Sequence, residues 1–264
     1  MIAPGVKIAT WNVNSIRQRA ALVADWLSRV QPDVLLLQEI KCEAPAFPTE
    51  AFAALGYRSE IVGQKAYNGV AVLARLPVEV VHRALPGLPI EDAQARYIEI
   101  DAVGLTIAGL YLPNGNSGGA TGLAYKWAWM DALAARAAAL LEADRPCLFA
   151  GDFNVCPTAA DCAPGLLAAD DALVHPESRA RWRRLLWLGL TDAVRALQPT
   201  GAAYSFWDYQ AGAWPRDRGL RIDHALLSPA LAERLLAAGA DRAERGREQP
   251  SDHVPVTIDI GPSP

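Results

Sequence analysis

Short apolar runs separated by turn residues recur along this chain, and residues 78–112 form one such run after another with short connections between them. Short connections require antiparallel neighbours, because a parallel pair needs a crossover of about a dozen or more residues. They exclude a purely doubly wound parallel sheet. Helical periodicity lies between other runs, so the sequence predicts an α/β protein in which helices cover the outer faces of packed sheets.

The alternation of apolar and polar residues places these elements along the chain. Strands are predicted at residues 7–13, 34–38, 61–63, 69–76, 78–82, 97–102, 105–112, 147–151, 204–209, 221–227 and 254–260. Helices are predicted at residues 16–30, 124–143, 178–188 and 230–238. Since 52% of the residues are hydrophobic and only 20% are charged, the chain can bury a large core, and we expect a single domain spanning residues 1–264.

Composition also bounds the cellular setting and the partners. The four cysteines show neither a Cys-x-x-Cys pair nor histidines at zinc-finger spacing, which predicts a reduced, cytoplasmic protein. No apolar stretch is long enough to cross a bilayer, so we expect no membrane partner. The net charge of −4 argues against a uniformly basic protein that coats nucleic acid. It is compatible with an acidic metal centre flanked by local positive charge, such as Arg216, Arg218 and Arg221.

Polar clusters stand where many of the apolar runs end. These clusters are Asn12-Val13-Asn14, Gln38-Glu39, Tyr111-Leu112-Pro113-Asn114, Gly151-Asp152-Phe153-Asn154, Arg221-Ile222-Asp223 and Ser251-Asp252-His253. One such cluster alone is more often a cap or a turn. Together they supply the oxygens and the histidine that hold a hard divalent cation and polarise a phosphate for attack by water. The joint pattern therefore favours a metal-dependent hydrolase.

Two carboxylates stand out because an uncompensated charge is costly at the end of a buried strand. Glu39 follows an apolar run, and a cation is its natural partner, with Lys41 as the alternative. Gly151 permits a close backbone approach, and strand alternation places Asp152 and Asn154 on one face. A carboxylate and a carboxamide in one site suit the activation and orientation of a water molecule.

One histidine has the surroundings that a phosphate-binding role requires. Asp223 shows the same alternation as the clusters above, and Asp252 and His253 come just before the last predicted strand. A carboxylate that holds a histidine keeps one tautomer and favours the charged imidazole. His253 is therefore predicted to be the functional histidine, whereas His82 and His175 do not stand in such a cluster of carboxylates.

These segments resemble the motifs of bacterial exonuclease III and the related apurinic/apyrimidinic endonucleases. They follow the family's order from residue 6 to about residue 260. The matching segments are Trp11-Asn12-Val13-Asn14-Ser15-Ile16-Arg17, Leu37-Gln38-Glu39-Ile40-Lys41, Tyr111-Leu112-Pro113-Asn114-Gly115, Gly151-Asp152-Phe153-Asn154-Val155, Tyr204-Ser205-Phe206-Trp207-Asp208-Tyr209, Arg221-Ile222-Asp223-His224 and Ser251-Asp252-His253-Val254-Pro255-Val256.

The resemblance implies the endonuclease/exonuclease/phosphatase fold, a DNase I-like four-layer α/β sandwich with two mostly antiparallel sheets and a site at one end. It also implies a Mg²⁺ cofactor, for which Mn²⁺ would substitute. Glu39 would be the principal ligand, supported by Asn12 and Asp252. The set expected around the metal also includes Asp152, Asn154 and His253.

The same resemblance implies a role for each catalytic residue. Asp152 would activate the attacking water and Asn154 would orient it, while Tyr111 and Asn114 would contact the scissile phosphate. Asp223 would hold His253, which would neutralise a non-bridging phosphate oxygen.

The segment from 204 to 221 separates DNA repair from other chemistries on this fold. By resemblance, Phe206, Leu220 and Ile222 wall a pocket for a flipped, base-less sugar. Arg216 and Arg221 are expected to contact DNA, because their group of basic residues lies beside this aromatic segment. An apolar pocket too small for a base admits a deoxyribose that lacks one. The loop 115–122 contains no arginine or lysine, so we expect its insertion into DNA to be weak or absent.

The sequence therefore predicts a monomeric DNA repair phosphodiesterase that cleaves duplex DNA 5′ to abasic sites and trims recessed or blocked 3′ ends. The strongest alternative is a phosphatase or phospholipase of the same superfamily, which the same catalytic residues would serve. The aromatic residues at 204–209 and the nearby arginines favour DNA. A catalytically silent protein that binds damaged DNA is less favoured, because no acidic or histidine position is missing.

Overall fold

The computed structural model describes residues 5–88, 92 and 94–263, which form two six-stranded sheets. The first sheet has the order β11 (Leu235–Ala240), β12 (Val256–Ile260), β1 (Val6–Asn12), β2 (Val34–Gln38), β4 (Val70–Ala74) and β3 (Arg58–Val62). The second has the order β5 (Glu79–His82), β6 (Tyr97–Ala102), β7 (Leu105–Tyr111), β8 (Cys147–Asp152), β10 (Asp223–Leu227) and β9 (Thr191–Asp192). Only β1–β2 and β7–β8 are parallel among the described pairs, so the predicted mostly antiparallel arrangement is confirmed.

Six α-helices flank the sheets in the described part of the chain. They are α1 (Ile16–Val30), α2 (Thr49–Ala53), α3 (Ala120–Glu142), α4 (Pro176–Trp187), α5 (Ala193–Leu197) and α6 (Pro229–Ala232). Short 3₁₀ helices occupy Ala44–Ala46, Ala159–Asp161 and Arg242–Gly246. None of the described helices is long and apolar enough to span a membrane.

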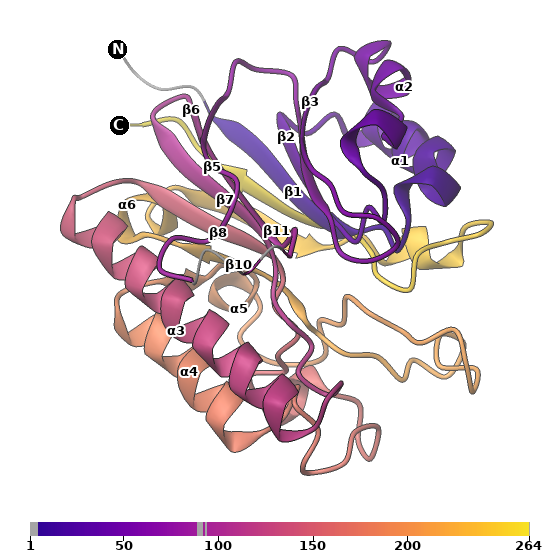
Figure 1. The fold of residues 1–264 in the computed structure, drawn as a ribbon, viewed down its shortest axis with the longest axis vertical. Helices are drawn as coiled ribbons and strands as arrows, with labels where there is room; N and C mark the ends of the chain where they lie inside the picture. Colours follow the sequence, from indigo (N-terminus) through magenta and orange to yellow (C-terminus); the bar gives the residue numbers. More distant parts are fainter. Residues whose placement is uncertain (1–4, 89–91, 93, 264) are drawn as a thin grey trace.

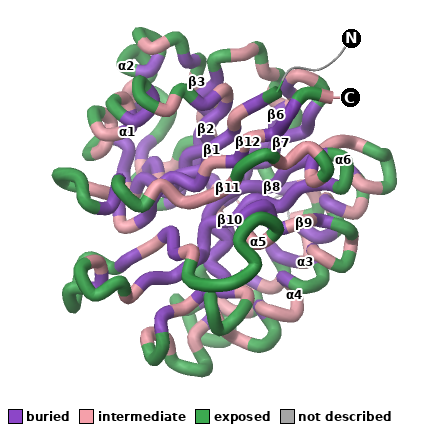
Figure 2. The backbone as a smooth tube through the Cα atoms, turned by 180° about the vertical axis from the view of Figure 1, so that it is seen from behind, coloured by how far each residue is buried: buried purple, intermediate pink, exposed green. Residues whose placement is uncertain are grey.

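Three apolar clusters show that the molecule is built in four layers, as predicted. The inner faces of the two sheets meet through residues such as Ile8 and Leu36 from one sheet and Ile107 from the other. The outer face of the first sheet packs against α1 and α2, and that of the second packs against α3 and α4. These helix pairs lie on opposite sides of the strands (Figure 1), and the buried backbone runs between them (Figure 2).

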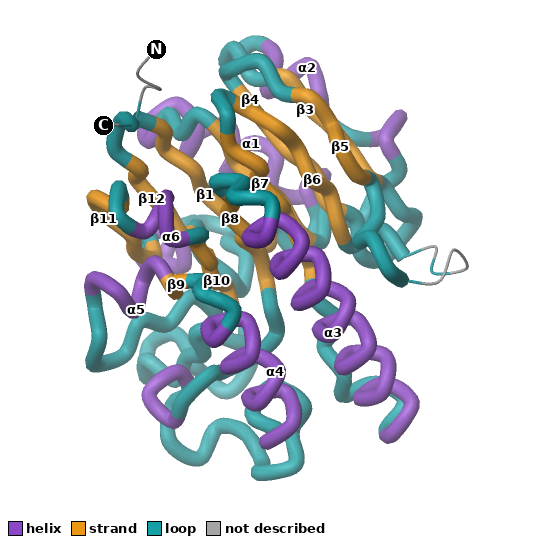
Figure 3. Tube along the Cα trace, turned by 90° about the vertical axis from the view of Figure 1, so that its left-hand side faces the viewer, coloured by secondary structure: helices purple, strands orange, loops and turns teal. Residues whose placement is uncertain are grey.

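Strand register brings the predicted polar residues to one end of this sandwich. In the second sheet Asp152 lies opposite Tyr111 on one side and opposite Asp223 on the other. In the first sheet Asn12 pairs with Gln38, and Glu39 comes next along the chain. The loops that follow β8 and precede β10 lie beyond the same strand ends (Figure 3). Because β1 runs parallel to β2 and β7 runs parallel to β8, the polar residues at the carboxyl ends of these strands lie at one edge of the sandwich.

The structure corrects several predicted elements. The helix predicted at 230–238 is only α6, and the strand β11 follows it, because residues from Leu235 onward pair with β12. The strand predicted at 204–209 is reduced to isolated bridges from Phe206 to Leu220 and to His253. The helices α2 and α5 were not predicted, since each has only 5 residues and too little periodicity to detect.

Candidate active site

The side-chain amide of Asn12 joins the two sheets at the site. Its Nδ2 atom donates to Oε1 of Glu39 at 2.9 Å and to Oδ2 of Asp152 at 3.0 Å. Asn12 is fully buried, and Ser251 donates to its main-chain carbonyl at 2.7 Å. One buried amide thus fixes two carboxylates that come from different sheets.

The turn after β8 fixes Asp152 and Asn154 together. Oδ1 of Asp152 accepts from the main-chain N–H of Asn154 at 2.9 Å, and Asn154 has a left-handed φ of 48°. The side-chain amide of Asn154 donates to the carbonyl of Leu112 at 2.9 Å and accepts from Asn114 at 3.1 Å. A Cβ at Gly151 would lie 1.9 Å from the carbonyl oxygen of Leu110, so this close approach requires glycine. The predicted shared face of Asp152 and Asn154 is therefore a hydrogen-bonded turn.

His253 is held by two buried carboxylates. Its Nδ1 lies 2.8 Å from Oδ2 of Asp223, and its Nε2 lies 3.8 Å from Oδ2 of Asp152. Ser205, which the sequence reasoning did not single out, donates to Oδ2 of Asp223 at 2.6 Å. The serine stands inside the aromatic segment 204–209, and its position before Phe206 was its only signal. Asp223, His253 and Ser205 form one connected unit.

Electrostatics in this unit favour a charged imidazole. Burial alone would lower the pKa of His253, but the carboxylates of Asp223 and Asp152 raise it to about 10. Burial raises the pKa of Asp152, and the positive charge on His253 opposes that rise. Burial and the carboxylates of Glu39 and Asp152 also raise the pKa of Tyr111 well above its usual range, so this phenol is a neutral hydrogen-bond donor.

Glu39 has a second partner on the solvent side. Its Oε2 lies 2.8 Å from Nζ of Lys41, the alternative partner that the sequence suggested. Lys41 also contacts Asn14, whose amide donates to Oδ1 of Asp252 at 3.2 Å. Burial would raise the pKa of Glu39, but the hydrogen bonds from Asn12 and Lys41 hold it below its usual value. Asp252 thus joins the same group of polar residues through Asn14.

The charges of these residues fit a divalent cation bound through oxygen. Four carboxylates gather here, at Glu39, Asp152, Asp223 and Asp252, and the cations in direct contact with them are Lys41 and His253. Oδ1 of Asp223 is buried and has no hydrogen-bond partner in the described part of the chain. Excess negative charge with hard oxygen donors is the chemistry that Mg²⁺ and Mn²⁺ prefer.

His253 keeps both of its predicted roles. Ligand atoms of Asp152, Asp223 and His253 lie within 4.8 Å of one another, close enough to hold an ion. Nδ1 of His253 faces Asp223, so Nε2 is the atom that would contact a metal or a phosphate oxygen. The charged imidazole that the carboxylates favour suits contact with a phosphate oxygen, and metal ligation by His253 stays a prediction.

An apolar cluster borders His253. The ring of Phe206 lies 4.9 Å from the imidazole of His253, centroid to centroid, in an edge-to-face arrangement. Phe206 packs in one cluster with Leu220 and Ile222, which are each 3% exposed. Leu173, from the loop that precedes α4, belongs to the same cluster. The structure thus brings together the three residues predicted to wall a sugar pocket.

The two arginines predicted to contact DNA have different surroundings. Arg221 is 2% exposed, and its guanidinium lies 2.6 Å from Asp161 and 2.8 Å from Asp192. The prediction that Arg221 contacts DNA is therefore wrong, because its guanidinium is buried and paired with two carboxylates of the protein. Arg216 is exposed and, with Arg218, lines a cavity of about 310 Å³, so it remains available to a phosphate.

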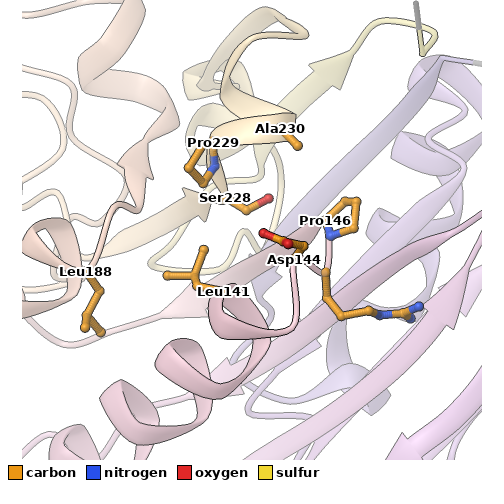
Figure 4. A pocket seen from close by; sticks show the side chains of 8 residues that line it. Leu141, Asp144, Pro146, Leu188, Ser228, Pro229 and Ala230 are labelled. Atoms are coloured by element: carbon orange, nitrogen blue, oxygen red, sulfur yellow. The ribbon is translucent and has the colours of Figure 1, made fainter.

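A hollow elsewhere in the molecule is unrelated to this site. It has a volume of about 350 Å³ and lies between the end of α3 and the start of α6, where Leu141, Asp144, Ser228 and Pro229 line it (Figure 4). The hydroxyl of Ser228 there accepts from the main-chain N–H of Cys147. None of its lining residues belongs to the polar group at the strand exits.

Known proteins share this fold. The Endonuclease/Exonuclease/phosphatase family matches residues 9–253. The chain is 35% identical to an exodeoxyribonuclease III of Haemophilus influenzae over 266 residues, which cover 95% of this chain and 98% of the relative. A solved 3′ phosphatase from Neisseria, bound to a product DNA hairpin, superposes with a TM-score of 0.92 at 38% identity, covering 97% of this chain and 99% of that one. An AP endonuclease from Archaeoglobus fulgidus gives a TM-score of 0.89 at 33% identity, with the same 97% and 99% coverage. The chain belongs to the endonuclease/exonuclease/phosphatase family.

Proposed function

We propose that this protein is a DNA repair nuclease that hydrolyses phosphodiester bonds in duplex DNA. It cleaves 5′ to abasic sites and removes nucleotides or blocking groups from 3′ ends. Its cation is Mg²⁺, for which Mn²⁺ substitutes. The observation that carries the proposal is the contact of Phe206 with His253, which sets an apolar wall directly beside a phosphate-binding group.

Asp152 and Asn154 act on the attacking water. Oδ2 of Asp152 lies between the amide of Asn12 and the imidazole of His253, and burial gives this carboxyl a pKa suited to taking a proton near neutral pH. The side-chain amide of Asn154 is held from two sides, so it can offer a fixed hydrogen bond to the same water. Glu39, Asn12 and Asp252 would hold the cation, which when bound polarises the phosphate and stabilises developing negative charge.

His253 stabilises the charge that develops on the phosphate. Its Nδ1–H is used by Asp223, so Nε2–H is left to donate to a non-bridging oxygen. Tyr111 and Asn114 lie on the same edge and would donate to the other oxygens. A charge-assisted donor fixed before the reaction gains more in the transition state than in the ground state, because it needs no reorganisation.

Phe206 favours DNA over a small phosphate ester. A ring packed on His253 cannot bind metal or move a proton, so its contribution is to recognition. An extruded sugar without a base would pack on this ring, and extrusion is easiest where base stacking has already been lost. The relatives include an exodeoxyribonuclease III and an AP endonuclease, enzymes whose names agree with a DNA substrate.

One assay tests this function. The protein is incubated with a small phosphate ester and with matched duplexes that carry an internal abasic analogue, a 3′-phosphate or an unmodified recessed 3′ end. Each substrate is tested with Mg²⁺, with Mn²⁺ and with a chelator. We expect metal-dependent cleavage of all three duplexes, and cleavage of small phosphate esters alone would refute the proposal. Phe206→Ala should change the ratio of abasic-site cleavage to recessed-end digestion, and an equal loss of both in a folded variant would assign Phe206 to the core.

The cellular location and the oligomeric state are part of the proposal. The described cysteines are all free thiols, which suits the reducing cytoplasm, and we propose that location. We also propose that the protein acts as a monomer, because the amides and carboxylates of the proposed site find their hydrogen-bond partners within one fold. Light scattering of the protein with and without a short duplex would test the oligomeric state.

A further inference from the structure

Lys126 is a buried cation close to the proposed site and has no acidic partner there. It lies on α3 with 0% exposure, and no carboxylate of the described residues forms a salt bridge with it. Burial lowers its pKa to about 7, and Asp152 opposes that shift. A buried ammonium without a salt bridge is costly, so its hydrogen bonds decide what it does.

Those hydrogen bonds go to the two turns that carry the active-site amides. Nζ of Lys126 donates to the main-chain carbonyl of Asn114 at 2.9 Å and to that of Asn154 at 2.5 Å. The side chains of the same two residues are joined at 3.1 Å. A closed ring of hydrogen bonds therefore runs through Lys126, Asn114 and Asn154, and the lysine is its only member from outside the two turns.

The glycine at position 115 leaves space for the side chain of Lys126. Gly115 has a φ of 92°, and a Cβ there would lie 2.7 Å from Cδ of Lys126. The glycine is therefore needed both for its backbone conformation and for the space the lysine occupies. Lys126 also stands in register with the buried stripe of α3 that contains Trp129, Met130 and Leu133, which was the one sequence signal for its burial.

We propose that Lys126 is a positioning residue for phosphodiester cleavage: it locks the turn of Asn114 to the turn of Asn154 and so fixes the amide that orients the attacking water. This inference rests on the proposed function. It needs the donor atoms of Lys126 and not their titration, because a neutral amine still donates two hydrogen bonds. Lys126 acts through Asn154 and Asn114, and it does not touch the substrate.

The test compares Lys126→Met with wild type on the abasic duplex under single-turnover conditions with Mg²⁺. We expect the cleavage rate to fall by about 10- to 100-fold, the effect typical of removing a hydrogen bond behind an active-site group. Duplex affinity in the presence of a chelator should stay within about threefold, because a fully buried side chain makes no contact with DNA. Lys126→Arg, which keeps the donors, should recover part of the rate.

A matched control separates positioning from helix packing. Arg136 lies on the same helix and pairs with the buried carboxylate of Glu99 at 2.6 Å, away from the two turns. Arg136→Met should lower stability at least as much as Lys126→Met and leave the rate per folded molecule unchanged. Asn114→Ala combined with Lys126→Met should cost less than the product of the two single losses, because both disrupt one arrangement.

Each outcome decides the inference. A folded Lys126→Met that cleaves within about twofold of wild type, or whose loss lies entirely in DNA affinity, would overturn it. The inference would also be overturned if the double variant lost as much rate as the product of the losses in Lys126→Met and Asn114→Ala. If Lys126→Met does not fold, Gly115→Ala serves instead, since its Cβ would displace the lysine chain, and an unchanged rate there overturns the proposal. Failure of the wild-type protein to cleave would refute the proposed function itself.

Discussion

Replacing Asp223 with asparagine should move the alkaline limit of activity, because Asp223 keeps His253 charged. The carboxylate lies 2.8 Å from Nδ1, and both side chains are almost fully buried. Two unit charges about 4 Å apart attract by about 4 kcal/mol at an effective dielectric constant of about 20. At about 1.4 kcal/mol per pH unit, this attraction corresponds to about three pH units.

The raised pKa of His253 sets how stability and activity change with pH. His253 has a folded-state pKa of about 10 against 6.5 for a free imidazole, so its ion pair stabilises the folded protein fully below pH 6.5 and is lost as the pH rises through about 10. Wild-type cleavage should therefore persist to strongly alkaline pH. In Asp223→Asn the alkaline limb should shift about three units toward neutral pH, with a loss of folding stability of up to about 4 kcal/mol at pH 7.

Single-turnover cleavage of the abasic duplex between pH 6 and pH 10.5, with a thermal melt at each pH, measures both effects. Asp208→Asn is the matched control, since it makes the same chemical change at an exposed carboxylate that, among the described residues, accepts only from the N–H of Gln210. A folded Asp223→Asn variant with an unmoved alkaline limb would refute the charge argument. The double substitution with His253→Gln should cost little more than the worse single change, because the pair acts as one unit.

Three further changes test the remaining assignments. Glu39→Gln should keep its fold and lose most turnover at ordinary Mg²⁺, and wild-type metal dependence in a Mg²⁺ titration would remove Glu39 from the metal site. Arg216→Ala should lower the slope of log affinity against log salt by about one, measured by fluorescence anisotropy on duplex DNA, and an unchanged slope would exclude a phosphate contact. Arg221→Met should destabilise the protein by about 3–5 kcal/mol in denaturant titrations, because the buried carboxylates of Asp161 and Asp192 lose their partner; a change under about 1 kcal/mol would contradict the buried ion pairs.

The buried network around Arg221 also explains how the pocket wall is held. Arg195 joins Arg221 on Asp161 at 2.5 Å, and His224 contacts Arg221 at 3.0 Å. Burial and the positive charge of Arg221 lower the pKa of His224 to about 4, so this histidine is neutral near pH 7. These ionic contacts anchor the chain on both sides of Ile222, whose side chain faces the apolar cluster.

The sequence alone determined the features that depend on local pattern. Apolar alternation located most strands, including β2, β6 and β7 to within a residue, and the polar residues at their ends identified the site. Glu39, Asp152, Asp223 and His253 were recognisable because charged groups at the ends of buried strands need compensation, and each has a partner in the structure.

Tertiary structure decided everything that depends on which segments meet. Arg221 looked like a DNA contact beside Arg216, but Asp161 and Asp192 lie 60 and 29 positions away in sequence, and only the fold brings them to its guanidinium. The segment 230–238 had helical composition, yet its last residues, from Leu235 onward, form a strand, because pairing with β12 overrides weak local propensity. Nothing in the sequence singled out Lys126, and its proposed role depends on α3 placing it between two turns that lie 40 residues apart in the chain. The local sequence pattern determines which residues have the chemistry to act. What each residue contacts depends on distance and burial in the folded chain, and no short stretch of sequence contains that information.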